Sequence, residues 1–377
     1  MNWTSLNPAE PRFQTWFDIL QPTYNSKNVR CTIWNSCKTS TVIIPKNCSD
    51  SVKFDGEICS PDSDSIHGNI KQICLIPLTI LIIGINVCVL VVILTNKRFH
   101  STTYMLIAAL GIADLCVGFV SIGTLITQAS EKTLELCLIR IGFTIAACID
   151  SLLFLMLIAI DRYIAVFRGL RYIQIVTKSR ILVGICLASV ISLIAGFLPL
   201  MGWRVEFYYN YCSFQYVVPA NYIMFLFSSC VLIPILVMFT IYGRLYRNAQ
   251  FHIKKIESIE NITQPRPTKG QLRISPRTAK SLKTLMIVFG CVVLTWMPFL
   301  ATSVAQIIRG DSACYLKDIV GTHLLLLGFS NSFLNPVIYA IGTRDFREKF
   351  IQKCFRRFQC MRPRRANIFP VVSGTRL

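Results

Sequence analysis

Seven long apolar segments alternate with short polar stretches along most of this chain. Each is close to the ~20 residues that a helix needs to cross a bilayer. They cover residues 70–95, 102–127, 134–167, 179–200, 219–246, 279–308 and 315–341. Because the connections between the first helices are short, neighbouring helices should run antiparallel in a bundle. The pattern predicts an all-α membrane protein, with a seven-transmembrane helix bundle over residues 70–341.

The third segment carries polar groups on one face, although it is too apolar for water. At about 100° per residue, one stripe of this helix holds Arg140, Thr144, Cys148, Ser151, Ile158 and Arg162. Charge inside a membrane helix is costly and is usually kept for a function. We therefore expect this helix to carry functional groups at both ends and along its middle.

The charge distribution predicts the orientation. The chain is 53% hydrophobic and 15% charged, with a net charge of +20. Its basic residues follow the odd-numbered helices, where the positive-inside rule puts cytoplasmic loops, so the charge needs no nucleic-acid partner. The N-terminus should be extracellular and residues 342–377 cytoplasmic, in a multi-pass protein of the plasma membrane. No signal peptide is visible, so the first membrane helix should act as the insertion signal.

Residues 1–69 form a polar N-terminal segment with four cysteines. Their positions are Cys31, Cys37, Cys48 and Cys59. An extracellular segment of this kind fits disulfide bonding in any of three pairings, although an unstructured tail with incidental cysteines is the alternative. Asn2 and Asn47 begin glycosylation sequons.

After the seventh segment, the sequence predicts a short amphipathic eighth helix. Phe346, Phe350 and Cys354 recur at four-residue spacing with basic residues between them. Such a helix lies on the inner membrane face, where Cys354 or Cys360 could be palmitoylated. Cysteines without lipid are the alternative.

Several polar residues fall at membrane depth within the apolar segments. They are Asn86, Asp114, Ser151, Asn331, Ser332 and Asn335. Each is expensive alone in hydrocarbon, so we expect them to satisfy one another. A carboxylate with hydroxyl and amide oxygens suits a hard cation, and a sodium ion would offset the Asp114 charge. A hydrogen-bonded network with water and no ion is the alternative, and no other metal site or cofactor is expected.

Cys137, at the start of the third segment, and Cys212, after the fourth, should form a disulfide that ties the loop over the mouth of the bundle. Cys314 is then an odd thiol that either pairs with the N-terminal segment or stays free.

Among the prolines in the apolar segments, Pro298 and Pro336 are the expected hinges, because a membrane helix bends where proline frees a carbonyl.

Six motifs, in order and helix by helix, resemble those of the rhodopsin-like (class A) G-protein-coupled receptors over about residues 70–355. They are Asn86, the IADL run at Asp114, Asp161-Arg162-Tyr163, Pro234 with Tyr242, Trp296-Met297-Pro298 and Asn335-Pro336-Val337-Ile338-Tyr339. The resemblance implies that Arg162 contacts a heterotrimeric G protein when the sixth helix swings out. It also implies that Tyr242 and Tyr339 support the active state, that Trp296 lies under the ligand, and that arrestin is a partner.

Within this family, the runs LRYIQIVTKSR, MGW at 201–203 and CSFQYVVPANY resemble adenosine receptors. The runs EKTLELCLIR, WMPFLATSVAQ and LLLLGFSNSFLNPVIYA resemble the glucose-dependent insulinotropic receptor. This resemblance implies a ligand pocket formed by Arg140, Thr144, Cys148, Phe214, Trp296, Phe299, Ser303 and Gly328. Amine receptors have an aspartate where Thr144 stands, which disfavours an amine ligand. The expected ligand is a lipid amide or lysophospholipid with its head near Arg140, and the expected signal is a rise in cyclic AMP. An adenosine or nucleoside ligand stacked on Phe214 is the alternative, and Arg140 could instead be a side chain that snorkels to the outer boundary.

Other classes fit less well. A retinal-based pump needs a lysine in the seventh helix, and residues 320–342 contain none. A transporter should show inverted repeats, and no clear repeat is visible. A membrane enzyme lacks a suitable cluster of catalytic residues. We therefore expect a receptor and not an enzyme.

Two departures from the family pattern predict local features. Ser189 replaces the tryptophan common midway along the fourth helix, and Asp150 faces away from the polar stripe, so we expect these two side chains to form a hydrogen bond. Thr278 stands where many members have an acid that pairs with Arg162. Without that pair the inactive state should be held less firmly, which predicts basal signalling.

Overall fold

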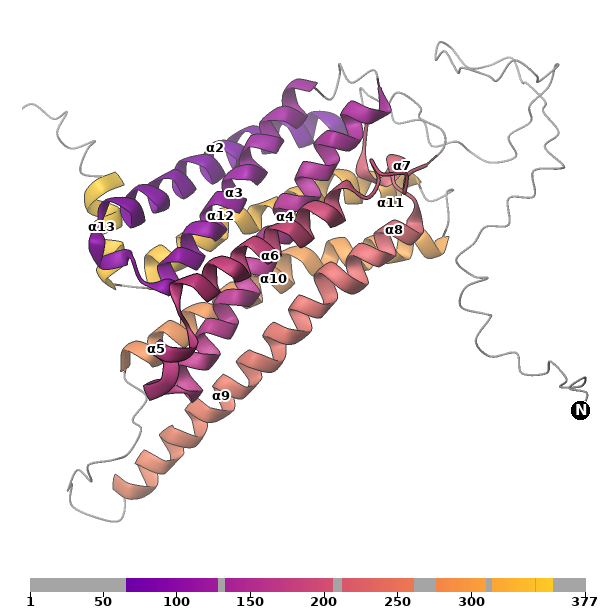
Figure 1. The fold of residues 1–377 in the computed structure, drawn as a ribbon. Coiled ribbons are helices and arrows are strands. Elements are labelled where there is room, and N and C mark those ends of the chain that lie inside the picture. Colours follow the sequence, from indigo (N-terminus) through magenta and orange to yellow (C-terminus); the bar gives the residue numbers. More distant parts are fainter. Residues whose placement is uncertain are drawn as a thin grey trace, which may run out of the picture.

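The computed structural model describes residues 66–127, 133–205, 212–260, 276–309, 314–342 and 344–354, and every regular element in these ranges is helical. The long helices lie side by side in one bundle (Figure 1). They are α2 (Ile66–Thr95), α3 (Thr102–Thr127), α4 (Leu134–Phe167), α6 (Lys178–Phe197), α9 (Ile233–Glu260), α10 (Pro276–Arg309) and α12 (Leu325–Gly342). Within the described ranges, six spans are long and apolar enough to cross a membrane. These are the first six of the seven predicted segments.

Two of the predicted segments are interrupted by π-helical turns. The fifth is built from α8 (Ala220–Phe225), the π-helix η3 (Leu226–Leu232) and α9. The seventh is built from α11 (Cys314–Ile319), the π-helix η4 (Val320–Leu324) and α12. The sequence predicted one continuous segment in each place, because hydropathy does not distinguish an i→i+5 turn from an α turn. Such turns are frequent at functional sites.

Short elements lie at the ends of the bundle. They are the 3₁₀-helices η1 (Lys97–Phe99) and η2 (Gly169–Arg171), and the one-turn helices α5 (Tyr172–Ile175) and α7 (Phe214–Val217). The predicted eighth helix is α13 (Arg344–Cys354). Its Phe346 is buried with a ring centroid 5.4 Å from that of Phe99, and Lys353 donates a 2.6 Å hydrogen bond to Thr95. These contacts hold α13 against the end of α2.

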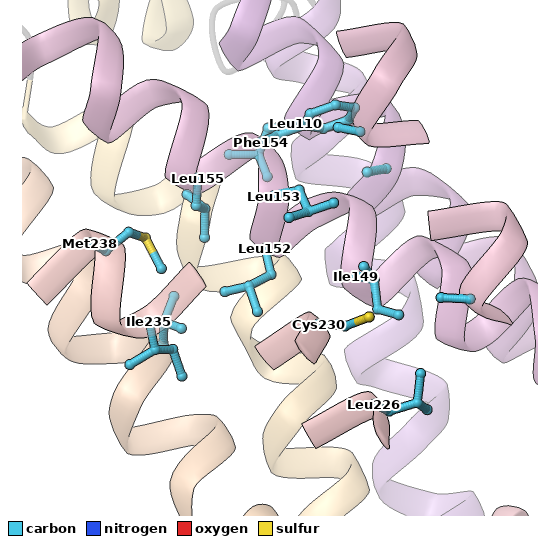
Figure 2. Packing of buried hydrophobic residues seen from close by; sticks show 14 of the residues in the cluster. Leu110, Ile149, Leu152, Leu153, Phe154, Leu155, Leu226, Cys230, Ile235 and Met238 are labelled. Carbon is cyan, nitrogen blue, oxygen red and sulfur yellow. The ribbon is translucent and has the colours of Figure 1, made fainter. Parts of the chain in front are cut away.

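The helix α4 is the central element of the bundle. Its buried side chains pack against α3 on one side and against η3 and α9 on another (Figure 2). The side chains in this contact include Leu110, Ile149, Leu152, Leu153, Phe154, Leu155, Leu226, Cys230, Ile235 and Met238. By contrast, large apolar side chains on the outer helices are exposed, among them Ile73, Phe119, Phe239 and Leu294. This outward apolar surface suits contact with lipid and not with water.

The backbones of α4 and α6 meet at two glycines. A Cβ built on Gly196 would collide with the carbonyl oxygen of Gly142, and it would lie 3.0 Å from the backbone nitrogen of Ala146. Glycine at this crossing therefore allows an approach that a side chain would prevent.

Candidate functional site

A cavity opens in the bundle near the end that carries the start of α4. Its wall comes from α4, α7, η3, α10, η4 and α12, with single side chains from α2 and α3. Most of the lining is apolar or aromatic, and the lining residues include no Asp or Glu. The polar members of the wall are Thr124, Arg140, Thr144, Ser213 and Gln215. The cavity volume is about 120 Å³, which is below the ~300–1,000 Å³ of typical small-molecule sites.

Arg140 is the charged residue among those that line the cavity. Its guanidinium donates hydrogen bonds to Thr124 Oγ1 at 3.2 Å and to Cys212 Sγ at 2.8 Å. Cys212 forms a disulfide with Cys137, and their Cα atoms are 5.6 Å apart. The expected pair thus ties the loop after α6 to the start of α4. We call this end of the bundle the disulfide end.

Aromatic rings form the apolar part of the wall. Phe299 lies at the centre of the group, with its ring centroid 5.8 Å from Trp296, 6.4 Å from Phe214 and 6.0 Å from Phe227. The contacts with Trp296 and Phe227 are edge-to-face, the arrangement that aromatic quadrupoles favour. The rings bring α7, η3 and α10 together on one wall of the cavity.

Six of the eight predicted pocket residues line the cavity. They are Arg140, Thr144, Cys148, Phe214, Trp296 and Phe299. The other two lie elsewhere. Ser303 is fully buried and is 3.5 Å from the side-chain nitrogen of Gln215, while Gly328 packs against Trp296, whose ring would lie 3.2 Å from an added Cβ.

Gln215 is a lining residue that the sequence reasoning missed. It is 6% exposed, and its side-chain oxygen has no hydrogen-bond partner among the described residues. The sequence did hold a signal for Gln215, because it lies three residues after Cys212. The disulfide to Cys137 brings the turn that follows Cys212 to the cavity. Arg140 and Gln215 therefore put donors and an acceptor on the same cavity wall.

The predicted polar network is assembled around Asp114, deep between α2, α3, α4 and α12. The carboxylate accepts from Ser151 Oγ at 2.9 Å and from Asn335 Nδ2 at 3.1 Å. Asn86 Nδ2 donates to the backbone oxygen of Ser332 at 3.0 Å. All these residues and Asn331 are buried.

The oxygen atoms of these buried residues are of the kinds that a small hard cation binds. The side-chain oxygens of Asn331 and Asn335 are buried without a hydrogen-bond partner among the described residues. Together with the Asp114 carboxylate and the Ser151 hydroxyl, they offer the carboxylate, amide and hydroxyl ligands that such a cation prefers.

At the end of the bundle opposite the disulfide end, Arg162 lies near the C-terminus of α4. It donates to Asp161 Oδ2 from Nε at 2.9 Å and contacts Thr103 of α3 through a second nitrogen. Thr103 and Tyr172 also donate to the Asp161 carboxylate, at 3.0 and 2.6 Å. Burial and the bond to Asp161 raise the pKa of the Tyr172 phenol, so it keeps its proton and remains a donor.

The remaining residues expected to support activation lie on α4, α9 and α12. Tyr242 and Tyr339 are buried in the same apolar cluster, and the Tyr242 ring centroid is 5.4 Å from that of Phe289 in α10. Pro336 lies inside α12, and Tyr163 accepts a hydrogen bond from Arg244 at 3.5 Å.

The predicted bond between α4 and α6 is confirmed. Ser189 Oγ lies 3.1 and 3.2 Å from the two oxygens of Asp150, and Ser192 Oγ is 3.4 Å from one of them.

Several other predictions concern parts outside the described residues. These are the N-terminal cysteines Cys31, Cys37, Cys48 and Cys59, the sequons at Asn2 and Asn47, Cys360, and the side chains of Thr278, Cys314 and Cys354.

The comparison with known families now decides the class. A profile described as "7 transmembrane receptor (rhodopsin family)" matches residues 85–339, more than half of the chain. This chain belongs to that family. It is therefore a multi-pass membrane receptor and not an enzyme, and the expected seven-helix bundle is confirmed.

Individual members of the receptor family are similar over most of this chain. The rat glucose-dependent insulinotropic receptor is 31% identical over 291 residues, which cover 72% of this chain and 59% of the relative. The human adenosine receptor A2a is 30% identical over 283 residues, 70% of this chain and 67% of the relative. The human histamine H2 receptor is 30% identical over 301 residues, 77% of this chain and 80% of the relative. The adenosine and histamine receptors, which are named for different ligands, are thus equally similar at 30% identity, so identity alone does not select a ligand.

Proposed function

We propose that this receptor binds a lipid amide or lysophospholipid at its disulfide end, and that it signals through a stimulatory heterotrimeric G protein to raise cyclic AMP. The observation that carries the proposal is the composition of the cavity wall. A single guanidinium, Arg140, stands at one end of a wall that is otherwise mostly apolar and aromatic. An amphiphile with an acceptor head and a hydrocarbon chain complements that wall.

Gln215 favours the amide among these lipids. An amide head has a carbonyl that accepts from Arg140 and an N–H that donates to the free side-chain oxygen of Gln215. A phosphate head has acceptors for Arg140, but it offers Gln215 no donor when it is ionised. An amine ligand is disfavoured because the lining residues include no carboxylate to pair with it.

A long acyl chain is larger than the present cavity of about 120 Å³. Ligand binding must therefore coincide with an expansion that separates α10 and α12 from α4. Pro298 within α10 and Pro336 within α12 are the positions where such bending would be absorbed. The ligand would then shift the population of bundle conformations toward the one that binds the G protein.

The test is cyclic AMP in cells that express the receptor and are exposed to N-oleoylethanolamine, oleoyl-lysophosphatidylcholine and adenosine. We expect the amide to act, and Arg140→Ala to lower its potency by about tenfold or more, because a hydrogen bond from a charged donor is worth about 1.5–3 kcal/mol. Arg204→Ala is the matched control, since Arg204 pairs with Glu135 at 3.6 Å and does not line the cavity. Equal losses in the two variants would contradict a role for Arg140 in ligand binding.

A nucleoside is the second candidate, because Phe214 lines the cavity and presents a ring on which a purine could stack. A response to adenosine that Phe214→Ala abolishes, without a response to either lipid, would replace the lipid proposal.

We also propose a sodium ion in the Asp114 network. Asp114, Ser151, Asn331 and Asn335 would hold the ion through their side-chain oxygens. When bound, the ion would offset the buried carboxylate charge and favour the contracted bundle.

The proposed orientation places the disulfide end outside the cell, at the plasma membrane. The basic residues that follow odd-numbered helices support it. A shift in electrophoretic mobility on enzymatic deglycosylation, lost when Asn2 and Asn47 are both replaced by Gln, would test it.

A further inference from the structure

A second hollow lies on the outside of the bundle, between α3, α4 and α6. Its volume is about 270 Å³, and its floor contains the small side chains Ala109, Ala113, Ala146 and Ala147. Ile112, Phe143 and Leu193 line it as well, and these side chains are 55%, 49% and 45% exposed. Since these helices span the membrane, the hollow faces lipid. We call it the α3/α4/α6 groove.

The groove contains a carboxylate. Asp150 is half-buried in its wall, where it accepts hydrogen bonds from Ser189 and Ser192 of α6. An acidic group on a lipid-facing surface is costly, and two neutral hydroxyls do not neutralise its charge. The signalling network does not use Asp150, because Ser151 and not Asp150 reaches Asp114.

Two of the residues that line the groove, Asp150 and Ser189, are the positions where this chain departs from the family pattern. Ser189 stands where a tryptophan is common, and a tryptophan at that place would fill the groove. The glycine contact near Gly142 and Gly196 brings α4 and α6 together close to the disulfide end, and the groove opens further along the same two helices.

Asp150 lies close to the middle of the bilayer. It is about 16 Å along α4 from Asp161 and about 20 Å from Cys137, at the ~1.5 Å rise of each helical residue. A phospholipid head group stays at the membrane surface and does not reach this depth. A compact molecule that dissolves in the hydrocarbon does reach it.

We propose that the α3/α4/α6 groove binds a lipid-soluble amine, with a compact hydrocarbon body on the alanine floor and a protonated nitrogen paired with Asp150. Charge complementarity selects this class, because an ammonium both donates a hydrogen bond and offsets the carboxylate in a medium of low dielectric. The site is separate from the main cavity, with which it shares no lining residue. It does not depend on the ligand proposed for that cavity.

Photoaffinity labelling of the full-length receptor in lipid nanodiscs tests the proposal. The probe is an adamantyl amine that carries a diazirine, and the labelled residues are mapped by peptide mass spectrometry. We expect labels on groove residues of α3, α4 or α6, competition by 1-adamantylamine, and at least tenfold weaker competition by 1-adamantanol or adamantane-1-carboxylate. The three competitors share one hydrocarbon cage, so they differ in the head group alone.

Two variants separate charge from space. Asp150→Asn keeps the shape and removes the charge, and Ser189→Trp keeps the charge and fills the groove; each should lower groove labelling at least tenfold. Thermal unfolding of both variants shows whether they are folded, and either folded variant alone is sufficient for the test. Equal competition by the alcohol, or undiminished labelling of a folded Asp150→Asn receptor, would overturn the proposal.

Discussion

Arg162 shows how a single residue expected to be functional is held in place. Its guanidinium is bonded to Asp161 on its own helix and to Thr103 on α3, and Tyr172 supports the same carboxylate from the following loop. The sequence predicted Arg162 but not Thr103 or Tyr172, because their contacts depend on how α3 and α5 pack. Thr103 lies 59 residues before Arg162 and Tyr172 lies 11 residues after Asp161, so local spacing along the chain does not reveal these partners.

Position 278, where many family members carry an acid that pairs with the residue at Arg162, should set the level of basal signalling. Thr278 has no charge to pair with Arg162, so we expect measurable cyclic AMP without ligand. Thr278→Glu should lower that basal level by up to about fivefold, because an exposed ion pair is worth about 0.2–1 kcal/mol. Thr278→Gln is the matched control, with a similar size and no charge.

The comparison is made at equal surface expression, with mock-transfected cells as the zero level. A basal signal indistinguishable from mock cells would contradict the prediction, and so would an equal reduction by Gln.

At the scale of elements, the sequence predicted the position of nearly every long helix, because apolar length is a strong signal. It missed the π-turns η3 and η4, which redirect side chains without changing the apolar composition. This limit extends to the cavity. Val231 lies within η3 and Gly321 within η4, and both line the cavity. The lining residues within the two π-turns are therefore the part of the cavity that a continuous helix does not predict.

The crossing of α4 and α6 predicts a strong effect of one methyl group. Gly196→Ala would force the helices apart, since the added Cβ meets the backbone at Gly142 and Ala146. We expect a loss of about 1–3 kcal/mol in stability, the usual cost of overpacking. Gly243→Ala is the control, because nothing lies within 4 Å of a Cβ at that position of α9. It should leave stability unchanged or raise it by up to ~1 kcal/mol.

The midpoint of thermal unfolding of the purified receptor measures both glycine variants. A Gly196→Ala receptor that unfolds at the wild-type temperature would show that the two helices do not need this close approach.

The disulfide end should be stabilised by its covalent link. Replacing Cys137 and Cys212 together by Ser opens a connection of 75 residues between them, and such a loss typically costs about 2–4 kcal/mol. It also removes the sulfur to which Arg140 donates. We therefore expect a lower unfolding temperature and a lower agonist potency. If the double variant unfolds at a lower temperature but keeps its agonist potency, the disulfide stabilises the fold without contributing to ligand binding.

At the scale of the whole molecule, the cavity, the Asp114 network and the Arg162 end share one helix, α4. The small cavity and the retained bonds of Arg162 to Asp161 and Thr103 fit a contracted form of the bundle. The proposed ligand, which needs a larger cavity, and the proposed sodium ion, which needs a closed network, would then favour opposite forms. Linkage requires each to weaken the binding of the other.

This linkage predicts that sodium lowers agonist affinity. Replacing sodium by N-methylglucamine at constant ionic strength should raise affinity several-fold in the wild-type receptor, since a ligand shifts the equilibrium by its differential affinity for the two forms. Asp114→Asn should abolish the effect, because it removes the charge that holds the ion. Asp150→Asn should keep the effect, because this neighbouring carboxylate bonds to Ser189 and Ser192 outside the network. Competition binding in membranes measures all three receptors, and a sodium effect that survives in Asp114→Asn would place the ion elsewhere.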